Sequence, residues 1–155
     1  MDVPPVQDAQ PPKGLIRLAN PIVAALLRSP LHRLVGKNLM LLTVTGRKSG
    51  RSYTLPVGRH QQPDGTLVVS AGGAWRHNLQ DGSEVRVVLD GRVRTAHVTV
   101  EEDPLRAAEV FRGLLDCAGP RALAVKITGD HSPTLEEIGP VMANRVIAYL
   151  KLATL

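Results

Sequence analysis

The sequence predicts a mainly β fold with peripheral helices (α+β), in which about six antiparallel strands form a small closed or half-closed barrel. Two observations carry this prediction. Short apolar runs follow one another through the middle of the chain, separated by turns that contain glycine or proline. Helical patterns lie only toward the two ends. In addition, a chain of 155 residues that is 43% hydrophobic but only 3% aromatic fits a single domain with an aliphatic core.

The N-terminal part predicts a leader followed by a helix. Residues 1–13 contain four prolines and few apolar groups, which is typical of a disordered segment. We therefore expect one domain over residues 14–155. It begins with an amphipathic helix, because apolar residues recur at helical spacing from Leu15 to Leu26 and Asn20-Pro21 is a helix-start signal. Basic residues flank the apolar stripe, so the helix packs on the core or, alternatively, makes peripheral contact with an anionic membrane.

The middle of the chain predicts consecutive strands. The run at 39–45 is almost continuously apolar, as in a strand buried on both faces. Asp90-Gly91 is a strong signal for a two-residue hairpin, and in the strand after it the even and odd positions should face opposite ways. A last strand lies near the C-terminus. The expected strands are residues 39–45, 53–60, 66–71, 84–89, 92–100 and 144–152.

Two helices are expected in the C-terminal part. Asp103-Pro104 is a cap followed by proline, and Gly119-Pro120 ends the helix that starts there. Residues 123–127 fit either a strand or a helical turn. Ser132-Pro133 opens a second, short helix, and Gly139-Pro140 closes it.

Cysteine usage and the lack of targeting signals indicate the setting. Cys117 is the one cysteine, which excludes an internal disulfide, and its place in an apolar helical pattern predicts a buried thiol. The N-terminus lacks the apolar core of a secretory signal. No apolar run reaches the ~20 residues that a membrane span needs. We therefore expect a cytoplasmic protein.

The strongest functional signal is the basic turn, Gly46-Arg47-Lys48-Ser49-Gly50-Arg51-Ser52. It joins two predicted strands and concentrates three cations, two hydroxyls and two glycines in seven positions. Such a turn at the mouth of a sheet suits phosphate or carboxylate oxygens. A solvated basic β-turn is the alternative. The net charge of +5 and the pI near 9.9 favour an anionic partner, whether nucleic acid, anionic lipid or a phosphorylated cofactor.

A second signal is the glycine–tryptophan segment, residues 71–79, which follows a predicted strand directly. Its paired glycines permit close backbone approach by a flat ligand. Trp75 could then cover a ring system and Asn78 could hydrogen-bond it. A core-plugging Trp75 and a helix-capping Asn78 explain the same residues without a ligand. His77 is a candidate general acid, although a lone histidine in a loop is more often structural or exposed.

Several kinds of site find no support in the sequence. The five histidines are scattered singly, so a dedicated metal site is not expected. The patterns of a P-loop, a dinucleotide-binding turn and a nucleophile elbow are missing. Nucleic-acid binding is disfavoured, because the cations lie in a turn and near helix ends and the β-surface lacks aromatic stacking platforms.

The order of the motifs resembles the deazaflavin (coenzyme F420)-dependent nitroreductase family, a branch of the split β-barrel flavin and deazaflavin oxidoreductases. That order is an apolar strand, Gly-Arg-Lys-Ser-Gly-Arg, a strand with Thr-x-Pro, Val-Val-Ser-Ala-Gly-Gly and Trp-x-His-Asn-Leu. The resemblance implies a split β-barrel of the FMN-binding-like type that binds coenzyme F420. This coenzyme is strongly anionic, because it carries a phosphodiester and a polyglutamate tail.

The resemblance also implies which residues hold the cofactor. The basic turn would contact the phosphate or the tail, the strand after it would run alongside the deazaflavin ring, and the glycine–tryptophan segment would close the other side. The implied cofactor-binding residues are Arg47, Lys48, Ser49, Gly50, Arg51, Thr54, Leu55, Pro56, Val57, Gly72, Gly73, Ala74, Trp75, His77 and Asn78.

The chain departs from the family pattern in two places. Ala74 and Trp75 are adjacent where family members often carry several more residues, and Arg76 stands where an aromatic is usual. The region 103–143 has no tyrosine, so no catalytic tyrosine is carried over from the nitroimidazole-reducing relatives. The catalytic residues therefore stay unassigned.

The expected function is hydride transfer from reduced coenzyme F420 to a small electrophile, such as a quinone, an enone or a nitro compound. The same fold with FMN is the first alternative. A non-catalytic protein that binds the cofactor or a lipid is the second. The protein is expected to be a monomer or a homodimer.

Overall fold

The computed structural model describes residues 6–8, 25, 39–46, 50–72, 74–120, 123, 125–128 and 132–153. The strands among them are β1 (Val6–Asp8), β2 (Leu39–Thr45), β3 (Ser52–Gly58), β4 (His60–Gln61), β5 (Leu67–Gly72), β6 (Glu84–Leu89), β7 (Arg92–Val100), β8 (Val125–Ile127) and β9 (Arg145–Leu152). The helices are α2 (Pro104–Ala118), α3 (Leu135–Met142) and the 3-10 helix η2 (Ala74–Asn78). The predicted N-terminal helix lies outside the described residues, apart from Ala25.

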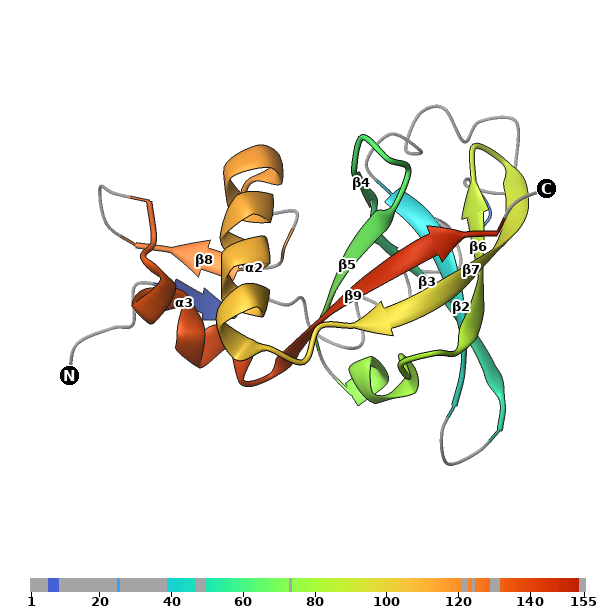
Figure 1. The fold of residues 1–155 in the computed structure, drawn as a ribbon, viewed down its shortest axis with the longest axis horizontal. Coiled ribbons are helices and arrows are strands. Elements are labelled where there is room, and N and C mark those ends of the chain that lie inside the picture. Colours follow the sequence, from blue (N-terminus) through green and yellow to red (C-terminus); the bar gives the residue numbers. More distant parts are fainter. Residues whose placement is uncertain are drawn as a thin grey trace.

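The described strands form an antiparallel barrel that closes through one short connection. A seven-stranded sheet has the order β3-β2-β6-β7-β9-β5-β4. The strands β3 and β4 lie at opposite edges of that order, yet only Arg59 separates them in the chain. The chain therefore bends at Arg59 and joins the two edges (Figure 1). The fold class expected from the sequence is confirmed.

The barrel is split along part of its length. Among the described strands, β3 pairs with β2 alone, and β5 pairs with β4 only at Leu67 and Val68. Beyond those residues, β5 pairs with no described strand other than β9. Hence β3 and the second half of β5 face each other without a ladder of hydrogen bonds between them.

Two cores hold the structure together. Alternate side chains of the strands fill the barrel, among them Met40, Leu42 and Leu150, each 0% exposed. The opposite face of β5 and β9 carries Val68 and Ile147, which pack with Phe111 of α2 and Ile138 of α3. Helices α2 and α3 therefore lie together on one side of the barrel (Figure 1). No helix among the described residues is long and apolar enough to cross a membrane.

Local sequence signals explain most of the points at which the helices and strands begin or end. Asp90 and Gly91 both have positive φ, at 51° and 76°, as a two-residue hairpin turn requires. The Asp103 side chain accepts a hydrogen bond from the Leu105 N–H at 3.0 Å and so caps α2. In β7 the even positions from 94 to 100 are buried or half-buried and the odd positions are exposed, as predicted.

The leader prediction is wrong for three residues. Residues 6–8 form β1, which pairs antiparallel with β8 in the register Val6 to Ile127. Val6 is 2% exposed and belongs to the second core. The composition of the segment predicts disorder, but a strand this short is stabilised by a partner more than a hundred residues away. The same pairing resolves the ambiguous segment 123–127 as a strand.

Two further predictions are wrong. The second helix does not end at Gly139-Pro140 but continues to Met142, and its cap is Thr134, which forms a capping box with Glu137. Burial of Val141 keeps the last turn helical despite Pro140. Cys117 is exposed rather than buried. It lies two positions after the buried Leu115, which turns it away from the second core.

Candidate functional site

The described part of the basic turn closes the β2–β3 hairpin. The Gly46 N–H donates to the Arg51 carbonyl at 2.7 Å, and the Gly50 N–H donates to the Gly46 carbonyl at 2.9 Å. Gly50 has a φ of +69°, a conformation that glycine adopts without strain. Gly50 and Arg51 are exposed. The other predicted residues of the turn, Arg47, Lys48 and Ser49, lie outside the described residues.

The strand β3 presents its predicted contacts on two faces. Leu55 packs against the barrel core and Val57 is part of it. Thr54 and Pro56 alternate with them and therefore face outward. The Thr54 hydroxyl lies 2.8 Å from the Thr43 hydroxyl on β2. The four side chains cannot all line one face of a ligand.

The glycine–tryptophan segment forms the end of β5 and the helix η2. Gly72 is buried at the end of the strand, His77 is exposed and Asn78 is half-buried. Trp75 is half-buried and packs against the barrel core, so the core-plugging interpretation accounts for one side of its indole. Gly73 and the side chain of Ala74 lie outside the described residues.

Strand register brings the two predicted half-sites to one end of the barrel. Thr43, near the end of β2, is the register partner of Arg86, near the start of β6. The strand β6 follows η2 after a short loop, and β2 leads into the basic turn. Both segments therefore lie at the same end, shown at the bottom of Figure 1. They flank the split between β3 and β5.

Sequence reasoning missed Arg86 as a member of this site. It is exposed on the outer face of β6, beside the Thr43–Thr54 hydroxyl pair. Alternation along residues 84–89 shows that Arg86 faces outward, but only the register shows which strand it lies beside. Arg86 adds a cation to the side of the hairpin that carries Thr54.

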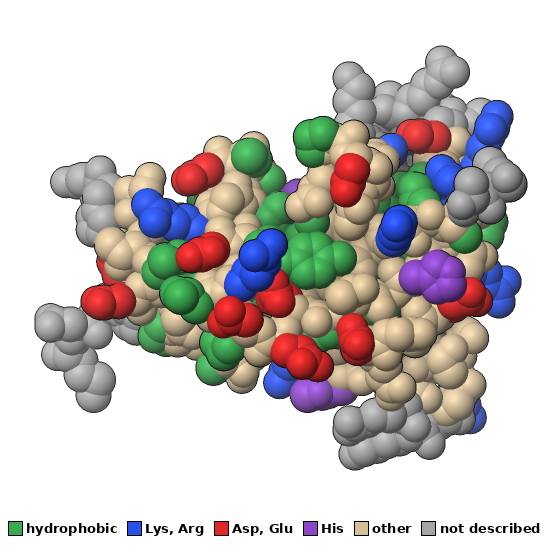
Figure 2. Space-filling model, in the orientation of Figure 1, with side chains coloured by type: hydrophobic (Ala, Val, Ile, Leu, Met, Phe, Trp, Pro, Cys, Tyr) green, Lys and Arg blue, Asp and Glu red, His purple; other side chains and the backbone are tan. Residues whose placement is uncertain are grey.

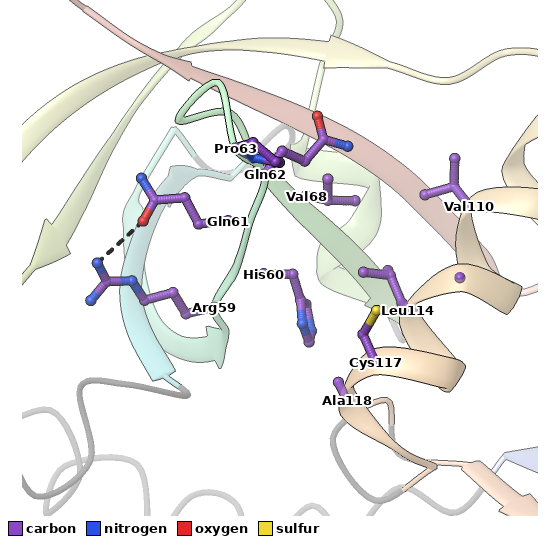
Figure 3. Close-up of a pocket in the computed structure, with 11 residues that line it drawn as sticks. Arg59, His60, Gln61, Gln62, Pro63, Val68, Val110, Leu114, Cys117 and Ala118 are labelled. Carbon is purple, nitrogen blue, oxygen red and sulfur yellow. Dashed lines mark hydrogen bonds between the residues drawn. The ribbon is translucent and has the colours of Figure 1, made fainter.

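The structure also contains a cavity that the sequence did not predict. It has a volume of about 870 Å³ and lies between α2 and the β4 arm, residues 59–63 (Figure 3). Figure 2 shows the surface hollowed between the helices and the barrel. The cavity is lined by Arg59, His60, Gln61, Gln62, Pro63, Val68, Val110, Gly113, Leu114, Cys117 and Ala118. No signal along the chain could have found it, because its two walls come from segments about fifty residues apart.

His60 and Arg59 determine the electrostatics of the arm. Burial lowers the pKa of His60 from its usual 6.5, so the imidazole is neutral near pH 7. The Arg59 guanidinium forms an ion pair with Asp90 at 2.8 Å and also donates to the Gln61 side chain at 3.4 Å. The positive charge of Arg59 is therefore already compensated. Among the described residues, no group of three or more His, Cys, Asp or Glu side chains is placed to hold a metal ion.

The chain is similar in fold to several solved structures. One, described only as a domain-swapped dimer, is 15% identical with a TM-score of 0.52, over 91% of this chain and 100% of that chain. An F420-H2 dependent reductase (FDR-A) is 18% identical with a TM-score of 0.49, over 73% and 94%. A structure titled as a pyridoxamine 5'-phosphate oxidase from Listeria innocua is 10% identical with a TM-score of 0.49, over 86% and 93%.

The sequence comparisons identify the family. No curated protein matches the chain significantly. The family model of F420H(2)-dependent quinone reductases matches residues 22–114, which is more than half of the chain. The matched segment contains the basic turn, the glycine–tryptophan segment and the split between β3 and β5. On this match, the chain belongs to the family of F420H(2)-dependent quinone reductases.

Proposed function

We propose that this enzyme transfers a hydride from reduced coenzyme F420 to a quinone, with the cofactor held along the split of the barrel. The observation that carries the proposal is the position of the family match. Residues 22–114 include both predicted halves of the cofactor site, and the register of β2 and β6 brings those halves to one end of the barrel.

The residues at this end fit an anionic cofactor. The turn exposes Arg51, and Arg86 lies on the neighbouring outer face. Gly50 allows a tight backbone turn at positive φ. Arg51, together with Arg47, Lys48 and Ser49 of the same turn, would hold the phosphate or the tail. When bound, the deazaflavin ring supplies the hydride.

The strands at the split would orient the ring. Because β3 is an edge strand, alternate backbone N–H and C=O groups along it face the split and can hydrogen-bond polar edges of a flat ligand. Pro56 fits this position, since an edge strand tolerates a residue without an N–H. Trp75 and Asn78 on η2 would bound the opposite side. The protein thus binds and orients the ring, and no side chain is assigned as an acid.

The proposal is tested by cofactor binding. Oxidised F420, followed by its fluorescence, should bind the purified protein at micromolar concentrations in low salt. The Arg47→Ala, Lys48→Ala double variant should weaken binding at least tenfold, because it removes two cations that the proposal assigns to the anionic tail. The matched control is Arg92→Ala, Arg112→Ala, which makes the same charge change at exposed residues outside the site.

Two results would contradict the proposal. Equal weakening by both double variants would mean that net charge, not the basic turn, drives binding. A purified protein with the absorption spectrum of bound flavin, or a thermal shift produced by FMN and not by F420, would favour the flavin alternative. The acceptor is tested separately, by oxidation of reduced F420 with duroquinone (tetramethyl-1,4-benzoquinone), and no turnover would refute the quinone assignment.

A further inference from the structure

We propose that the cavity between the β4 arm and α2 binds the quinone ring, with His60 donating a hydrogen bond to a ring carbonyl. The inference rests on the proposed function and deepens it by assigning the acceptor a site of its own.

The two walls of the cavity suit a flat, neutral ligand with polar edges. From α2, the half-buried Val110 and Leu114 offer an apolar surface, and Val68 adds a buried apolar side chain from β5. The arm supplies hydrogen-bonding groups opposite them. Its one cation, Arg59, is paired with Asp90. A quinone has an apolar ring and two carbonyl acceptors, and the volume of about 870 Å³ lies within the range of small-molecule sites, roughly 300–1,000 Å³.

The placement of His60 depends on Gly58. A Cβ atom at position 58 would come within 2.8 Å of the His60 Nε2 atom, so a larger residue there would displace the ring from its present position. Figure 3 shows His60 projecting from the arm and Cys117 from α2 into the same space. A neutral imidazole carries one N–H donor, which a quinone carbonyl can accept.

The cavity lies where the split of the barrel closes. The predicted ring contacts on β3 end at Val57, and the chain reaches His60 three residues later. On the other side, Val68 pairs with His60, and β5 then runs down to Gly72. An acceptor in the cavity would therefore lie next to a ring bound along β3. Hydride transfer needs such proximity.

The lone cysteine makes occupancy of the cavity measurable. Cys117 is exposed and lines the cavity, so iodoacetamide should alkylate it at a rate that intact-protein mass spectrometry can follow. Duroquinone is the probe, because all of its ring carbons are substituted and it does not add thiols. At saturating duroquinone we expect alkylation to slow at least threefold. In the Cys117→Ser, Asp116→Cys control, the thiol lies outside the cavity lining and its rate should not change.

A second experiment fills the cavity. Gly113 lies in α2, and a Cβ built there meets nothing within 4 Å. Gly113→Trp therefore places an indole in open space, and replacing a mid-helix glycine favours the helix. We expect the KM for duroquinone to rise at least tenfold while the Kd for F420 stays within twofold. Leu105→Trp is the matched control, because Leu105 is 59% exposed on the same helix and does not line the cavity.

The outcomes separate the two proposals. Unchanged alkylation of Cys117 in the presence of duroquinone, or an unchanged KM in Gly113→Trp, would overturn the cavity assignment while leaving F420 dependence intact. Failure of the wild-type protein to bind F420 would refute the proposed function. The alkylation experiment needs no cofactor, so it would still decide whether the cavity takes the quinone.

Discussion

His60 is the residue whose surroundings have the clearest measurable consequence. Burial lowers its pKa in the folded state below the usual 6.5. Between that lowered pKa and 6.5, the unfolded chain binds more protons than the folded chain. The free energy of unfolding therefore falls as the pH drops through this window, and the contribution of His60 is constant above it.

We expect this pH dependence to weaken when the imidazole is removed. Urea denaturation of the wild type and of His60→Gln, at pH 7.5 and pH 5.5, should show a larger loss of stability on acidification for the wild type. His77→Gln serves as the control, since His77 is exposed. Equal losses in the wild type and His60→Gln would mean that burial does not disfavour the charged imidazole.

For single residues, the sequence is sufficient to predict some of the observed positions but not others. The outward Thr54 and the capping Asp103 follow from alternation and helix-start signals. The exposure of Cys117 does not follow from the sequence. The apolar stripe of a helix shows which residues face the core only when the direction of the stripe around the helix is known to within one residue. Arg86 and His60 join their sites through register and through a bend, which no local pattern encodes.

Among the secondary-structure elements, β1 leads to the most specific prediction about stability. A three-residue strand from a proline-rich segment adds to β8 and buries Val6 against the second core. Helices α2 and α3 could be predicted because their caps are local. The β1–β8 pair could not, because neither strand is long or apolar enough to be recognised without the other.

Truncating Val6 tests whether β1 is docked. Val6→Ala should lower the free energy of unfolding by about 1–3 kcal/mol, since it deletes buried methyl groups. Val93→Ala is the control, because Val93 is 66% exposed and should change stability by no more than about 0.5 kcal/mol. Chemical denaturation of the two variants decides the point, and an equally small effect of both would mean that β1 contributes no packing.

At the scale of the whole molecule, the two proposed sites differ in the charge of the ligand that each would bind. The chain carries a net charge of +5, and the cofactor is a polyanion, whereas the quinone is neutral. Salt screens interactions between exposed charges over roughly 10 Å at 0.1 M. The barrel was foreseeable in outline from the strand pattern, but the second core and the cavity were not, because both exist only once the helices pack beside the sheet.

We therefore expect salt to act on one ligand and not on the other. Raising NaCl from 50 to 500 mM should raise the Kd for F420 at least fivefold, while the KM for duroquinone at saturating F420 stays within twofold. Fluorescence titration and steady-state kinetics measure the two quantities. A parallel rise in both would place the quinone near the basic turn rather than in the cavity.

The one-residue joint at Arg59 has a consequence for how this chain can change. Side chains along an extended segment alternate between faces, so one residue inserted or deleted there would turn His60 toward the opposite face. The same change would shift the pairing of His60 with Val68, on which closure of the barrel depends. The length of this joint is thus constrained twice, by the barrel and by the cavity, and an alteration that spared one would still disrupt the other.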